Sequence, residues 1–107
     1  MRFARTVSVR LKTNATTDFN RTMENEILPI LRQQRGFQDE ITLVKPNGTE
    51  AIGISLWDSK ESAEAYQRDA YPQVQKLLSK VIEGTPQVQT YDVATTTQKS
   101  ARGGGGA

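Results

Sequence analysis

The chain has 107 residues, 36% of them hydrophobic, which is enough for one domain with a modest core. No apolar run approaches the ~20 residues needed to span a bilayer. The absence of Cys and His excludes disulfides, cysteine nucleophiles and the commonest metal ligand. The net charge of +2, with acids and bases interspersed, argues against a nucleic-acid partner, and the first residues lack a signal-peptide core, so we expect a cytoplasmic protein.

The first third of the sequence predicts a strand followed by a helix. Residues 3–11 alternate with a period of two, and one parity carries the apolar side chains Phe3, Val7, Val9 and Leu11. A single apolar stripe at helical spacing follows, formed by Phe19, Met23, Ile27, Ile30 and Leu31. Pro29 predicts a kink about one turn earlier in that helix, and Gly36 can end it by taking positive φ.

Two further strands are expected on either side of a tight turn at Asn47-Gly48. They cover residues 37–43 and about 50–57. The large aliphatic side chains of both strands share one parity, and we expect that parity to face the helices together with Val7 and Val9: Ile41, Leu43, Ile52 and Ile54.

The second helical region is expected to be broken in two. Asp58 or Ser59 is the N-cap candidate, and the pattern stops at residues 69–72, where Pro72 suits the first turn of a new helix. The new helix has an apolar stripe formed by Val74, Leu77, Leu78, Val81 and Ile82. Residues 84–86 end it, and a last strand, with room for a bulge, covers residues 87–95.

The predicted order β-α-β-β-α-β is the ferredoxin-like α+β arrangement, a four-stranded antiparallel sheet with helices on one face. We expect the domain to occupy residues 1–95 and the Gly-rich residues 96–107 to form a flexible tail. The sheet face opposite the helices is predicted to carry small and polar residues, among them Ser8, Thr42 and Ser55. Such a face can contact water or a second sheet, and the pattern leaves both open.

Three stretches of the chain, residues 26–37, 55–66 and 84–93, resemble the antibiotic-biosynthesis-monooxygenase-like (ABM) family. The resemblance extends over nearly the whole chain up to Thr95. It implies a dimeric α/β barrel, in which two subunits pack through the sheet faces opposite the helices. A homodimer is therefore the expected assembly.

Some members of that family oxidise aromatic polyketides without metal or flavin, so the resemblance implies no cofactor and a small aromatic or quinone-like substrate. In such chemistry the protein supplies an apolar pocket and a few polar groups that favour the deprotonated substrate. Other members degrade haem with an Asn, a Trp and a His. Val7, Tyr66 and Lys76 take those places here, and without the His ligand we do not expect haem chemistry.

Trp57, Tyr66 and Tyr71 are the catalytic candidates, because Trp and Tyr are residue types that this chemistry uses and the three cluster near the break in the second helical region. Each also has a plain packing interpretation. Arg10, together with Phe19 and Met23, completes the candidate pocket. Arg10 could instead pair with Glu40 across the dimer or stay solvated, and the two apolar residues could simply be core.

Two hypotheses about function remain from the sequence. The first is a cofactor-independent monooxygenase acting on a small aromatic or quinone-like substrate. The second is a non-catalytic dimeric barrel that binds a small ligand or responds to stress. The clustered aromatic residues favour the enzyme, and the lack of any titratable constellation favours the binding protein.

Overall fold

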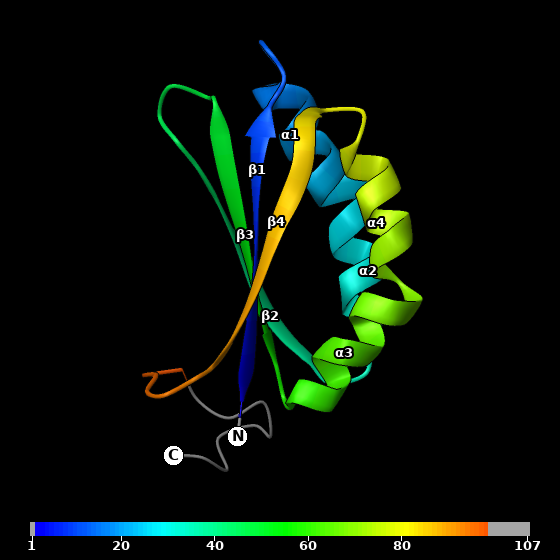
Figure 1. Ribbon diagram of the computed structural model, residues 1–107, viewed down its shortest axis with the longest axis vertical. Helices are drawn as coiled ribbons and strands as arrows, with labels where there is room; N and C mark the ends of the chain where they lie inside the picture. The colour runs from blue at the N-terminus through cyan, green and yellow to red at the C-terminus, as the bar shows by residue number, and fades with distance from the viewer. Residues whose placement is uncertain (1, 99–107) are drawn as a thin grey trace.

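A computed structural model describes residues 2–98 of the chain. Helices pack against one face of a four-stranded sheet, and no helix of these residues covers the other face (Figure 1). At one end of the sheet the segment after the last strand reaches Asp39, to which Gln98 donates a hydrogen bond of 2.8 Å. The elements, in chain order, are β1 (Phe3–Leu11), α1 (Thr16–Thr22), the π-helical segment η1 (Met23–Ile27), α2 (Leu28–Arg32), β2 (Phe37–Val44), β3 (Glu50–Trp57), α3 (Lys60–Asp69), α4 (Tyr71–Leu78) and β4 (Ile82–Asp92). No helix in this part of the chain is long and apolar enough to cross a membrane.

The sheet has the strand order β2-β3-β1-β4, and all three neighbouring pairs are antiparallel. This is the ferredoxin-like arrangement that the sequence predicted, with the two helical connections on the same side of the sheet. The two strands that follow each other directly, β2 and β3, meet through a turn in which Gly48 has a φ of +73°. The bulge expected near the last strand is present as a register shift between β1 and β4, beside Ser8 and Arg10.

The helices are interrupted where the sequence predicted. A π-helical segment directly precedes the turn that contains Pro29, where the kink was expected. Ser59 caps α3, since its Oγ accepts a hydrogen bond from the Ser62 amide at 3.2 Å. The second helical region divides at Ala70, and Pro72 lies in the first turn of α4.

The end of α4 was predicted wrongly. The helix stops at Leu78, and β4 begins at Ile82, before the Gly84-Thr85-Pro86 sequence that was expected to separate the two. Val81 and Ile82 are buried, as the apolar stripe required, but they belong to the turn and to the strand. The tail predicted for residues 96–107 lies mostly outside the described residues.

The prediction of which side chains on β2 and β3 face the helices was also wrong. Ile41 and Leu43 of β2 and Ile52 of β3 are 57%, 53% and 39% exposed on the open face of the sheet. The pairing register explains this, because Val7 pairs with Gly53 and therefore shares its face. Once the apolar parity of β1 faces the helices, the small parity of β3 must do the same.

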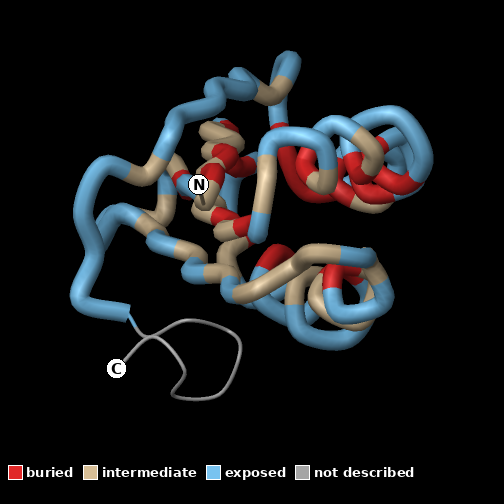
Figure 2. The backbone as a smooth tube through the Cα atoms, turned by 90° about the horizontal axis from the view of Figure 1, so that it is seen from below, coloured by how far each residue is buried: buried red, intermediate tan, exposed pale blue. Residues whose placement is uncertain are grey.

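The core lies between the helices and the sheet, where the buried residues are concentrated (Figure 2). Trp57 and Ile27 are its most deeply enclosed large side chains. The Trp57 ring packs edge-on against Phe37, with 5.6 Å between ring centroids. It also packs against Tyr66 in a tilted arrangement, with 5.0 Å between centroids. This aromatic cluster joins the end of the β2–β3 hairpin to α3.

Candidate functional site

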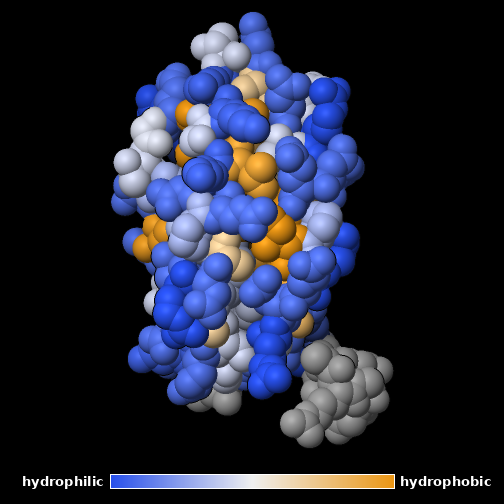
Figure 3. All heavy atoms as spheres, turned by 90° about the vertical axis from the view of Figure 1, so that its right-hand side faces the viewer, coloured by the Kyte–Doolittle hydropathy of each residue, from blue (hydrophilic) through white to orange (hydrophobic). Residues whose placement is uncertain are grey.

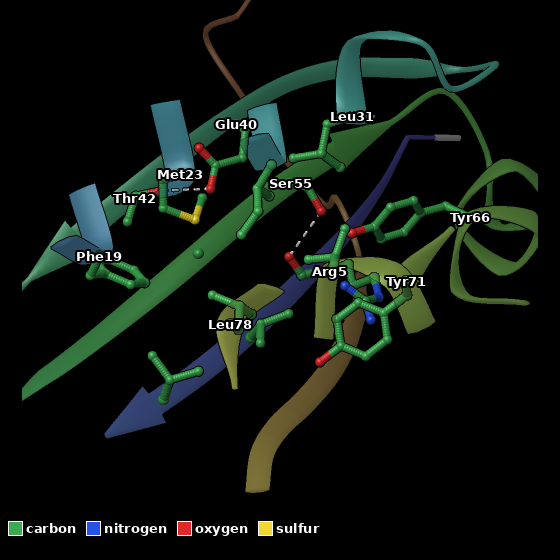
Figure 4. Close-up of a pocket in the computed structure, with 15 residues that line it drawn as sticks. Arg5, Phe19, Met23, Leu31, Glu40, Thr42, Ser55, Tyr66, Tyr71 and Leu78 are labelled. Atoms are coloured by element: carbon green, nitrogen blue, oxygen red, sulfur yellow. Dashed lines mark hydrogen bonds between the residues drawn. The ribbon is translucent and has the colours of Figure 1, made fainter. Parts of the chain in front are cut away.

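A cavity of about 50 Å³ lies under the helices, over the middle of the sheet (Figure 4). Side chains from α1, η1 and α2 form one wall, and side chains from α3 and α4 form the opposite wall. The floor is the helix-facing surface of β1, β2 and β3. The lining residues are Arg5, Val7, Val9, Phe19, Met23, Ile27, Leu31, Glu40, Thr42, Gly53, Ser55, Tyr66, Tyr71, Val74 and Leu78.

The polar part of the floor is one row across three neighbouring strands. Arg5 pairs with Ser55, and Ser55 pairs with Glu40. Because adjacent strands lie about 4.8 Å apart, the two charged residues stand roughly 10 Å apart at their Cα atoms, with Ser55 between them. A cationic guanidinium and a carboxyl group therefore enter the same cavity from different strands, and they form no salt bridge with each other.

Arg5 is the most unusual residue of the cavity, because its side chain is charged and only 3% exposed. Its guanidinium carbon lies 4.2 Å from the ring centroid of Tyr71 and 5.1 Å from that of Tyr66. Its Nε and Nη2 both donate to Oε1 of Gln67. No carboxylate in residues 2–98 pairs with this cation, and burial lowers its pKa.

The two tyrosines contribute phenol groups to the wall beside Arg5. Burial raises the pKa of Tyr66 to about 12, although the nearby Arg5 opposes the shift, so this phenol stays protonated at neutral pH. Burial also raises the pKa of Tyr71, again opposed by Arg5. The Tyr71 hydroxyl is buried beside the Arg5 guanidinium, which interacts with it, but no well-aligned hydrogen bond to it forms within the described residues.

Glu40 enters the cavity from β2, beside Met23 and away from the two tyrosines. Its Oε2 accepts a hydrogen bond of 2.7 Å from the Thr42 hydroxyl. Burial raises the pKa of Glu40, and the bond from Thr42 opposes that shift. Gly53 keeps space open next to it, since a Cβ on Gly53 would lie 3.2 Å from Glu40 Oε2.

Ser55 and Trp57 hold the floor of the site in place. The Ser55 hydroxyl donates to the Arg5 carbonyl oxygen at 3.4 Å and accepts from Trp57 Nε1 at 2.9 Å. Trp57 itself is completely buried and does not line the cavity. Its indole N–H therefore already has a partner, and its position supports the packing interpretation over contact with a substrate.

The structure brings together four of the six candidates from the sequence. Tyr66, Tyr71, Phe19 and Met23 line one cavity. Arg10 does not, because it is exposed on the opposite face of β1, whereas Glu40 faces the helices. The pairing of Arg10 with Glu40 across a dimer stays a prediction. Trp57 supports the cavity from behind.

Sequence reasoning missed the charged residues of the site, Arg5 and Glu40. A signal for Arg5 was present, because it interrupts the apolar parity that runs from Phe3 to Leu11. A charged residue on the buried side of a strand is uncommon and indicates a function or a specific partner. Glu40 carried no such signal, since its alternation with Ile41 predicted a solvent-facing side chain.

The outer surface over the helices is mostly polar, and apolar side chains appear along its middle (Figure 3). This view faces the side on which the helices lie, the same side as the cavity. Within residues 2–98 no three acidic side chains come together in a way that could hold a metal ion.

Comparison with known proteins identifies the fold. No protein-family model matches the sequence, and no curated protein matches it. Solved structures do match, including a monooxygenase from the gene ActVA-Orf6 of Streptomyces coelicolor, in complex with nanaomycin D. It is 14% identical, with a TM-score of 0.75 over 92% of both chains.

The chain has the antibiotic biosynthesis monooxygenase fold. SnoaB, a cofactor-independent oxygenase from Streptomyces nogalater, is 12% identical, with a TM-score of 0.74 over 92% of this chain and 98% of its own. A protein of unknown function from Nitrosomonas europaea is 9% identical, with a TM-score of 0.76 over 92% and 95%. At such low identity the monooxygenase fold is shared, while substrate and chemistry must be argued from the cavity itself.

Proposed function

We propose that this protein is a cofactor-independent monooxygenase that oxidises a small aromatic or quinone-like substrate. One observation carries the proposal: a buried arginine without a carboxylate partner lines an otherwise largely apolar cavity. An unpaired buried charge is costly to the folded state. A ligand that carries negative charge on an aromatic frame would offset that cost, and the tyrosine and apolar walls would enclose its rings.

The chemistry needs little from the protein beyond this environment. A substrate methylene group conjugated with an aromatic ketone loses a proton, and the resulting electron-rich anion reduces dioxygen. One oxygen atom becomes the new C=O group, and the other leaves with the two methylene hydrogens as water. Arg5 stabilises the negative oxygen of the anion, and the protonated Tyr66 and Tyr71 hydroxyls are hydrogen-bond donors to the oxygen atoms that develop charge.

The present cavity is smaller than such a substrate. Binding therefore requires side chains to move, and Met23 is suited to this because its unbranched side chain is partly exposed on the cavity wall. The two helical walls belong to separate segments of chain, so they can separate without breaking the sheet.

Oxygen uptake with anthrone and substituted hydroquinones tests the proposal directly. We expect the wild-type protein to consume oxygen faster than buffer and to convert anthrone to anthraquinone. Arg5→Met should abolish most of this activity while keeping the fold, because Met has similar length and no charge. Arg32→Met, on the exposed last turn of α2, is the matched control. Uptake equal to buffer in the wild type would reject the monooxygenase.

The second candidate is a non-catalytic barrel that binds a small ligand. Its supporting observation is that most of the cavity lining is apolar or aromatic, which suits a small bound ligand whether or not a reaction follows. Quenching of Trp57 fluorescence by an aromatic ligand, without any oxygen consumption, would favour this alternative.

We also propose that the protein forms a homodimer through the open face of the sheet. The supporting evidence is a cluster of large aliphatic side chains on the open face of β2 and β3: Ile41, Leu43 and Ile52 are exposed, and Ile54 and Leu56 beside them are partly exposed. An apolar surface of this kind is typical of a protein interface, and a second sheet can pack on it face to face. A single monomeric species in sedimentation velocity at micromolar concentration would reject the dimer.

A further inference from the structure

The position of Glu40 relative to Arg5 suggests a role for this acid that the proposed function leaves unassigned. Glu40 and Arg5 occupy opposite ends of one row across the cavity floor, and the residue between them, Ser55, is small. Neither charge neutralises the other through an ion pair. A ligand lying along this row would contact the acid at one end and the guanidinium at the other (Figure 4).

We propose that Glu40 accepts the proton that the substrate loses. This inference rests on the proposed function and applies to substrates whose C–H group is conjugated with a carbonyl group, such as anthrone. In the step, a substrate C–H bond breaks and its proton joins a Glu40 carboxylate oxygen. The electron pair of that bond delocalises onto the carbonyl oxygen, which faces Arg5 as an enolate. Dioxygen takes no part in this step.

The other polar groups on the cavity are poorer proton acceptors. Among the described residues that line it, Glu40 is the only carboxylate. The two tyrosines are neutral phenols, and the guanidinium has no basic site at neutral pH. Burial raises the pKa of Glu40, which makes its ionised form a stronger base than an exposed carboxylate.

The surroundings of Glu40 also fix where its carboxylate lies. Thr42, two residues along the same strand, donates a hydrogen bond to Oε2. Gly53 on the neighbouring strand leaves free space there, which any side chain would reduce. The carboxylate is thus held by one bond with room beside it, as a group that receives a proton from a ligand requires.

Hydrogen–deuterium exchange without oxygen isolates this step. The probe is anthrone in D₂O under argon, and NMR follows the loss of its methylene proton signal. We expect the wild-type protein to accelerate exchange over buffer and Glu40→Gln to lower that acceleration at least about 100-fold, the usual contribution of a general base. Glu64→Gln, on the exposed side of α3, should match the wild type.

Thr42→Val supplies a second readout, which a purely structural role of Glu40 would not change. The Thr42 hydrogen bond lowers the pKa of Glu40, so its removal should move the acidic limb of the exchange-rate profile to higher pH. A profile that stays in place, or equal exchange rates for Glu40→Gln and wild type, would overturn the proposal. So would wild-type exchange no faster than buffer.

Oxygen uptake measured on the same samples separates the two proposals. Exchange that depends on Glu40 without any oxygen consumption would reject the monooxygenase and leave the proton acceptor in place. Oxygen consumption that Glu40→Gln leaves unchanged would keep the monooxygenase and reject the role of Glu40.

Discussion

In most sheets that helices cover on one side, the apolar side chains face the helices and the polar ones face solvent. On half of this sheet the arrangement is reversed. On β2 and β3 the helix-facing side carries Glu40, Thr42, Gly53 and Ser55, whereas the open side carries Ile41, Leu43, Ile52 and Ile54. On β1 the pattern is the ordinary one, with Val7 and Val9 facing the helices and Thr6 and Ser8 on the open side. The kind of side chain that faces the helices therefore changes from apolar on β1 to small and polar on β3 and β2.

The two faces of β2 and β3 therefore suit different partners. Small and polar side chains on the helix side leave a cavity in place of a tightly packed core, and large aliphatic side chains on the open side provide apolar area that a single subunit does not bury. A ligand and a second subunit are the two partners that would complete the respective faces. The following predictions test that contrast, beginning with the largest expected effect.

Trp57→Ala tests the packing on the helix-facing side of the sheet and should cause the largest loss of stability. Trp57 is fully buried on the helix side, and replacing such an indole with Ala costs about 3–5 kcal/mol of unfolding free energy. Urea denaturation followed by circular dichroism measures the loss. A cost below about 1 kcal/mol would mean that the aromatic cluster around Trp57 is not packed as described.

Charges on the open face should abolish association without unfolding the subunit. Combining Ile41→Lys with Leu43→Lys places two cations in the proposed interface, and we expect the dimer to weaken at least 100-fold, equivalent to about 3 kcal/mol. Sedimentation equilibrium measures the dissociation constant, and far-ultraviolet circular dichroism checks the fold. Gln75→Lys on α4 is the control with added charge elsewhere. Unchanged association would place the interface on another surface.

Tyr71→Phe should stabilise the ligand-free protein slightly. Its hydroxyl is buried without a well-aligned hydrogen bond, although Arg5 lies near it, and removing this poorly satisfied polar group is worth about 1 kcal/mol. Thermal unfolding of both proteins gives the difference. Tyr91→Phe, on the open face with its hydroxyl bonded to Gln89, should not be stabilising. If Tyr71→Phe is clearly destabilising, the hydroxyl has a partner that this structure lacks.

Glu40→Gln should show the smallest effect, and it should depend on pH. The folded state raises the pKa of Glu40 through burial, so the protonated form is favoured in the fold and ionisation on raising the pH destabilises it. The variant and the wild type should therefore unfold alike near pH 4, and the variant should become the more stable as pH rises through the folded pKa of Glu40. Urea midpoints between pH 4 and 8 measure this, with Glu64→Gln as control; a gap that closes as pH rises would contradict it.

Much of the fold could be predicted from local patterns. Alternation gave the strands, the helical stripes gave the helices, and Pro29, Asn47-Gly48 and Pro72 marked the π-helical segment, the hairpin turn and the helix break. These features depend on residues close in sequence, so their physical causes are visible in the sequence. The end of α4 was missed because Val81 and Ile82 are apolar in either a helix or a strand.

The site was predicted only in part. Aromatic residues beside the helix break, Tyr66 and Tyr71, were found because their type and place were informative. Arg10 lies on the face opposite the helices, as the alternation of its strand predicted, and therefore does not line the cavity, whereas Trp57 is buried behind the cavity. Arg5 was overlooked although it broke the apolar parity of its strand.

The sequence by itself determined the elements, their order and therefore the ferredoxin-like topology, because periodicity, caps and turns act over a few residues. Only the tertiary structure decided which face of β2 and β3 meets the helices. That choice depends on the register in which β3 pairs with β1, and a shift of one residue would reverse every side chain. The register brings Arg5, Ser55 and Glu40 into one row, and so the chemistry of the cavity follows from long-range pairing.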